Sequence, residues 1–199
     1  MKKIGLLFAF AFFVVFSVAA KNVKRGGDAN LTPYLNESDA RVVCKDIVDQ
    51  IVQSPRIVRF SAQNNRDPVV SIGTIRDETG EFFDTQIIAN SLKTSILKSG
   101  VLEFMANKDI RDQMRDEVMD QSDHANEDAA KAIDDEDAAD YMLTGSVKLM
   151  IQNNGKLQER TYIVNIELTD LQTHRTVDMF EPSEDVKDYL KKVAKIKSK

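Results

Sequence analysis

The last third of the chain contains two stretches in which apolar residues recur at every second position, joined by a tight-turn sequence. A period of two places these residues on one face of a β-strand. The linking "NNG" at Asn153–Gly155 tolerates positive φ angles and predicts a hairpin. A second short turn, "QTH", leads into "RTVDM", so we expect an antiparallel meander of two or three strands. The alternating residues are Val147, Leu149 and Ile151, then Tyr162, Val164, Ile166 and Leu168.

Upstream, the pattern is helical. Asn36 or Ser38 can cap a helix, and Pro55 ends it, because the residue before a proline resists helical geometry. The apolar residues of this helix recur at helical spacing: Ala40, Val43, Cys44, Ile47 and Ile51. Cys44 lies on this apolar stripe, so we expect a small buried hydrophobe.

The middle of the chain predicts a strand, a helix and a short strand. "VVSIGTI" at Val69–Ile75 is rich in β-branched residues, and "VLEFMA" is a second, shorter candidate strand. Between them, Asp84 or Thr85 can begin a helix that Gly100 ends in a left-handed cap. The apolar line of this helix is Ile88, Leu92 and Ile96.

Residues 109–140 are strongly acidic, and two apolar edges predict two helices that cover the sheet. A last helix, carrying several lysines, is predicted near the C-terminus. A helix packed on the domain is favoured over one that touches an anionic surface, because acids are mixed with its lysines. The apolar side of this C-terminal helix would be Val186, Tyr189, Leu190, Val193 and Ile196. The apolar edge of the first acidic helix would be Ile110, Met114 and Val118, and that of the second Ala129, Ala130 and Ile133.

This order of elements predicts a single α+β domain, with helices on a sheet of about four strands and a C-terminal meander and helix. We expect three parts: an export signal at 1–20, a linker at 21–35, and the domain with its basic C-terminal helix at 36–199.

The first segment has the pattern of an export signal. Lys2 and Lys3 precede an apolar run, and Val18 and Ala20 stand at positions −3 and −1 of a cleavage site before Lys21. The alternative is an uncleaved anchor, because residues 4–20 just reach the length that a spanning helix needs. No cysteine follows the cleavage site, so we expect a periplasmic protein without a lipid anchor.

Charge and residue types exclude several functions. The formal net charge is −5, which disfavours nucleic-acid binding. His124 and Glu127 lack further metal ligands, and "DDED" at Asp134–Asp137 lacks the spacing of a calcium loop. No nucleophile, base and orienting group stand together in the sequence. We therefore expect no enzyme activity, no cofactor and no metal.

A local basic edge follows Pro55. Arg56 and Arg59 begin a polar run, "SAQNNRD", which ends at Asp67. Because acids outnumber bases in this chain, the edge could dock an acidic partner, and arginine is enriched at interface hot spots. The alternative is that the arginines pair with the chain's own acids. The partner-binding candidates are Arg56, Arg59, Asn64, Asn65 and Arg66.

Three stretches in order resemble the LpoB-type activators of penicillin-binding proteins. They are "LNESDARVVCKDIVDQIVQSPRI", "VVSIGTIRDETGEFFDTQIIANSLKTSILKSGVLEF" and "DAADYMLTGSVKLMIQNNGKLQERTYIVNIELTDLQT", which together span nearly all of 36–173.

The resemblance implies a TolB-N-terminal-like domain in a Gram-negative-type envelope. It implies a non-enzymatic partner of a bifunctional class A penicillin-binding protein, and we expect a monomer. Family members are typically lipoproteins on the outer membrane, whereas here Ala20 is followed by Lys21. Membrane association would then need an uncleaved signal. A rival function with the same fold is an envelope assembly or transport subunit of the curli-secretion or TolB type, which oligomerisation would favour.

Overall fold

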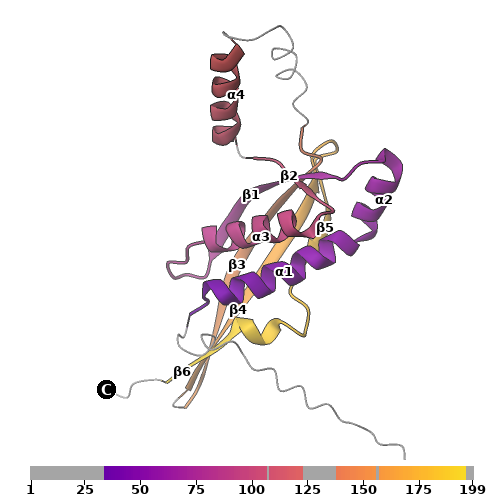
Figure 1. Cartoon of the computed structure of the whole chain (residues 1–199). Coiled ribbons are helices and arrows are strands. Elements are labelled where there is room, and N and C mark those ends of the chain that lie inside the picture. Colours follow the sequence, from indigo (N-terminus) through magenta and orange to yellow (C-terminus); the bar gives the residue numbers. More distant parts are fainter. Residues whose placement is uncertain (1–33, 107, 123–137, 156, 196–199) are drawn as a thin grey trace, which may run out of the picture.

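The computed structural model describes residues 34–106, 108–122, 138–155 and 157–195. One mixed sheet has the strand order β2–β1–β3–β4–β5, and a sixth strand, β6, also pairs with β4. Helices α1 and α3 lie together across one face of this sheet (Figure 1). The α+β fold is confirmed, although the sheet has six strands rather than about four. The helices are α1 (Glu37–Gln53), α2 (Pro55–Asn64), α3 (Gln86–Ser99) and α4 (Lys108–Ser122). The strands are β1 (Val69–Glu78), β2 (Glu103–Phe104), β3 (Tyr141–Asn154), β4 (Leu157–Asp170), β5 (Arg175–Phe180) and β6 (Lys191–Lys195).

The predicted meander forms the larger part of the sheet. β3 and β4 pair in register from Tyr141↔Asp170 to Asn154↔Leu157, and Gly155 turns the hairpin with φ 59°. β5 adds to the outer edge of β4 after a turn in which His174 has φ 54°. Of the predicted alternating side chains, Val147, Tyr162, Val164, Ile166 and Leu168 are buried. Leu149 is partly buried, and Ile151, near the hairpin, is 44% exposed, so that part of the prediction is wrong.

β1 occupies the centre of the parallel part. It pairs with β2 on one side and with β3 on the other, in both cases parallel. α3 therefore forms the connection from β1 to β2, and the segment containing α4 leads from β2 to β3. This topology brings the start of β3 beside the start of β1, which positions the site described below.

The core lies between the sheet and the two covering helices. α1 begins with a reciprocal capping box, in which the side chains of Asn36 and Asp39 each accept from the other's backbone N–H. All five residues of its predicted stripe are fully buried. Cys44 lies among them, and burial raises the pKa of its thiol to about 12, so the thiol is unreactive at neutral pH. On α3, Ile88, Leu92 and Ile96 are fully buried, and Gly100 is the left-handed cap.

The C-terminal helix was a wrong prediction. Residues 187–190 form a single 3-10 turn, and the chain then continues as β6, which pairs with Leu157–Thr161 of β4. β5 covers only the other end of the outer edge of β4, so β6 completes hydrogen bonding that this edge would lack. Alternation along β6 places Lys192 on the buried side, at 4% exposed, where it pairs with Asp39, whereas Val193 is 62% exposed.

The acidic helix α4 is confirmed, but its predicted place on the sheet is wrong. Ile110 and Met114 are 40% and 60% exposed, and Figure 1 shows α4 standing clear of the sheet. α1 and α3 already cover the helical face of the sheet. The second predicted helix, around Ala129–Ile133, lies outside the described residues, as does the export segment at 1–20. Within the described ranges, no helix is long and apolar enough to cross a membrane.

Candidate functional site

The predicted basic edge is a helix. Pro55 does end α1, but it also begins α2, because a proline at the first helical position lacks only an N–H that would have no helical partner. Ser54 caps the new helix by accepting from the backbone N–H of Ile57 at 3.4 Å. The fully buried Ile57 anchors α2 to the domain. Asn65 ends it in the left-handed conformation, with φ 52°.

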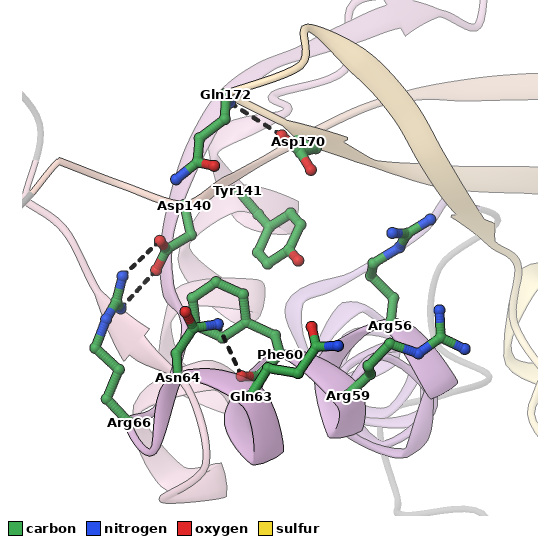
Figure 2. Close-up of a pocket in the computed structure, with 10 residues that line it drawn as sticks. All are labelled: Arg56, Arg59, Phe60, Gln63, Asn64, Arg66, Asp140, Tyr141, Asp170 and Gln172. Atoms are coloured by element: carbon green, nitrogen blue, oxygen red, sulfur yellow. Dashed lines mark hydrogen bonds and ion pairs between the residues drawn. The ribbon is translucent and has the colours of Figure 1, made fainter.

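A cavity of about 310 Å³ lies between α2, the start of β3 and the end of β4. Figure 2 shows the side chains of α2 on one side of this arginine cavity and those of the two strands on the other. The parallel pairing of β1 with β3 brings residues 140 and 141 to this place. The lining residues are Arg56, Arg59, Phe60, Gln63, Asn64, Arg66, Asp140, Tyr141, Asp170 and Gln172.

One wall of the cavity is a two-point ion pair. The guanidinium of Arg66 donates from both terminal nitrogens to the carboxylate of Asp140, at 2.8 and 2.7 Å. Asp140 is 6% exposed and also accepts from the backbone N–H of Val69 at 2.8 Å. Paired hydrogen bonds of this kind fix orientation as well as charge. Arg66 therefore holds the entry into β1 against the entry into β3, which is a structural role.

Aromatic rings form the base of the cavity. Phe60 and Tyr141 meet edge to face, with ring centroids 5.6 Å apart. The guanidinium of Arg66 lies over the Phe60 ring, 4.9 Å from its centroid. Burial, and then the nearby carboxylate of Asp170, raise the pKa of the Tyr141 phenol, so this group stays protonated at neutral pH.

Asp170 supplies the second carboxylate. Its Oδ1 accepts from the backbone N–H groups of Gln172 and Thr173 at 3.0 and 2.8 Å. The backbone hydrogen bond from Thr173 is the main cause that lowers the pKa of Asp170, and the charge of Arg56 adds to it. Asp170 is therefore ionised at neutral pH and is held in the turn that follows β4.

The charges of the cavity do not cancel. Three arginines face two carboxylates, and one of these carboxylates is bound to Arg66. Within the described part of the chain, no ion pair joins Arg56 or Arg59 to an acid at 4.0 Å or less. The predicted alternative pairs both arginines with the chain's own acids, in particular those between Asp109 and Asp140, of which residues 123–137 lie outside the described residues. It stays a prediction for that segment, and the described acids make no such contact. The arrangement can accept an anionic group from outside.

Of the five predicted candidates, Arg56, Arg59, Asn64 and Arg66 line the cavity, while Asn65 is the exposed cap of α2. Sequence reasoning missed the opposite wall, which comes from residues 140, 141, 170 and 172. It also missed Phe60. The Ser-Pro pair at 54–55, followed by apolar residues at 57 and 60, was a signal for a second helix that could have identified Phe60 as inward-facing.

No group of three or more metal-ligating side chains occurs among the described residues. The cavity likewise holds no serine, cysteine or histidine that could act as a nucleophile or base. The lining offers three guanidinium groups, two carboxylates and a phenol, which suit it to binding a charged or polar group.

The fold is α+β with a mixed sheet, and the arginine cavity is its candidate site for binding an anionic group. The family model "Peptidoglycan-synthase activator LpoB" matches residues 39–177, well over half of the chain. The chain belongs to the LpoB family, which is a family of envelope activators and not of enzymes. No curated protein sequence matches the chain.

Solved structures that the chain resembles include an LpoB domain, a lipoprotein and a dodecamer. The LpoB C-terminal domain from Escherichia coli is 13% identical, with 72% of this chain and 96% of that chain covered and a TM-score of 0.44. Lipoprotein GNA1162 from Neisseria meningitidis is 10% identical, with coverages of 65% and 83% and a TM-score of 0.38. The PelC dodecamer from Paraburkholderia phytofirmans is 18% identical, with coverages of 62% and 82% and a TM-score of 0.31.

Proposed function

We propose that this protein binds a bifunctional class A penicillin-binding protein in the periplasm and stimulates its synthesis of peptidoglycan. The observation that carries the proposal is the family match over residues 39–177. The activator itself performs no chemistry and acts through contact. Neither a cofactor nor a metal is part of the proposal.

We place one docking contact at the arginine cavity. Arg56 is half-buried and Arg59 is exposed, so both guanidinium groups are accessible to a partner on a rigid helix. An aspartate or glutamate from the synthase would enter between α2 and Tyr141. There it would form charge-assisted hydrogen bonds, which are stronger than those between neutral groups. The bound pair of Arg66 and Asp140 fixes the wall against which this side chain packs.

Reversal of the two accessible charges tests this contact. The double variant Arg56→Glu and Arg59→Glu should weaken binding to the purified synthase by about 2 kcal/mol or more, roughly thirtyfold. The binding that remains should depend less on salt, because fewer charges cross the interface. Stimulation of glycan-strand polymerisation from lipid-linked precursor should fall in parallel.

A charge-matched control is available on α1. Arg41 and Lys45 are exposed and pair with Glu37 and Asp49 on the outer face of that helix. The variant Arg41→Glu and Lys45→Glu changes the net charge by the same amount and should bind normally. Equal weakening by both double variants would mean that only net charge matters. If the wild-type protein neither binds nor stimulates the synthase and instead forms large oligomers in sedimentation, the assembly-subunit function is correct.

A further inference from the structure

The loop between β1 and α3 carries the most exposed aromatic side chain of the described residues. Phe82 is 98% exposed, whereas the adjacent Phe83 packs against Tyr162, with ring centroids 6.3 Å apart. Removing a phenylalanine from water is strongly favourable, so a fully exposed one is uncommon on a surface without a partner.

Hydrogen bonds hold this loop in one conformation. The carboxylate of Asp77 accepts from the backbone N–H and the hydroxyl of Thr79, at 2.9 and 2.6 Å. Its second oxygen accepts from the backbone N–H of Phe83 at 3.0 Å. Gly80 takes the left-handed conformation, with φ 72°, that the tight turn requires.

A buried cation anchors the loop from below. Arg160, whose side chain is 6% exposed, donates two hydrogen bonds to the carboxylate of Glu81, at 3.0 and 2.5 Å. Arg160 also lies over the ring of Tyr34, 5.0 Å from its centroid. Glu81, the residue directly before Phe82, is therefore held in place. A loop ordered on both sides of an exposed aromatic residue presents that residue with little further loss of entropy on binding.

We propose that Phe82 inserts into an apolar pocket with a basic rim on the same synthase, as a second contact that rests on the proposed function. The charge of the loop favours a protein partner over a bilayer. Glu78 is paired with Arg76 and Lys148, and Glu81 with Arg160, so Asp77 and Asp84 are the loop acids without a paired base among the described residues. These acids repel anionic lipid headgroups and attract lysine or arginine on a protein. The contact is separate from the arginine cavity, since the ten residues of β1 lie between them (Figure 1).

The test measures binding of the full exported chain to the purified bifunctional synthase of the same organism. Phe82→Ser should raise Kd at least tenfold, while Phe82→Leu, which keeps an apolar group, should stay within about threefold of wild type. Leu97→Ser is the matched control, because Leu97 is 58% exposed on α3 without an ordered loop around it. Its Kd should not change. Combined with Arg56→Glu, the effect of Phe82→Ser should multiply, as expected for distant sites.

Four results would overturn the proposal. A Kd for Phe82→Ser within twofold of wild type removes the contact while the proposed function stands. Absence of any wild-type binding removes the proposed function and this contact with it. Binding of the wild type, but not of Phe82→Ser, to vesicles of phosphatidylethanolamine and phosphatidylglycerol assigns the residue to lipid. Self-association that Phe82→Ser abolishes assigns it to a second copy of the chain.

Discussion

Substitution of Asp39 should destabilise the fold far more than its position in the first turn of α1 suggests. Its carboxylate lies 2.5 Å from the ammonium of Lys192 on β6, and the two side chains are 1% and 4% exposed. Asp39→Ala removes the carboxylate and leaves a lysine buried beside it. Breaking a buried ion pair in this way costs about 3–5 kcal/mol, and the lost capping box adds about 1 kcal/mol.

A change of about 4–6 kcal/mol corresponds to a fall in Tm of roughly 8–24 °C for a domain of this size. The measurement is urea and thermal unfolding followed by far-ultraviolet circular dichroism, since the chain contains no tryptophan for fluorescence. Asn36→Ala is the matched control, because it removes the same capping box and leaves the ion pair in place. It should cost only about 1 kcal/mol.

The double variant Asp39→Ala and Lys192→Met separates charge from packing. Methionine keeps most of the volume of lysine and no longer needs a carboxylate, so the double variant should be more stable than Asp39→Ala alone. The reasoning is refuted if Asp39→Ala costs no more than Asn36→Ala. It is also refuted if the two substitutions of the double variant simply add.

Three other predictions concern α1, the export signal and the loop after β1. Ile47→Ala empties a fully buried site and should cost about 2–5 kcal/mol in urea unfolding, whereas an unchanged curve would place the stripe of α1 in solvent. The mature protein should begin near Lys21, and an intact mass that retains Met1 or carries a lipid would contradict this. The pKa of Asp77 lies below its usual 3.8, chiefly because of the Thr79 hydroxyl. Its loop contacts should therefore persist above pH 3.8 and weaken as the pH falls further. A protection factor for hydrogen exchange at the N–H of Phe83 that does not fall in acid would count against them.

Local signals were sufficient to predict the elements that have strong periods and caps. The meander followed from alternation around Asn153–Gly155, and α3 followed from its apolar line and Gly100. α2 was missed because Pro55 was interpreted only as an end, although proline also suits a helix start. β6 was predicted as a helix because its apolar residues fit that period, whereas the open edge of β4 decides its conformation, and that edge is not visible in local sequence.

In the candidate site, too, some residues could be predicted from the sequence and others could not. Arg56 and Arg59 could be selected from the sequence because they stand out in an acidic chain. Asp140 and Asp170 could not be placed beside them, since they follow by more than 75 and 100 residues in sequence. Only the parallel pairing of β1 with β3 and the return of β4 bring them to α2, and long-range pairing of this kind leaves no local pattern.

The buried pair of Asp39 and Lys192 also ties the N-terminal end of α1 to the sheet, because Lys192 lies on β6 and β6 pairs with β4. The arginine cavity lies beyond the other end of α1, and 17 helical residues span about 25 Å. The two ends of α1 are therefore held by different contacts, the first by this ion pair and the last by the turn at Ser54 that begins α2. Loss of the ion pair would free the first end of α1 while the contacts around the cavity at the other end stay in place.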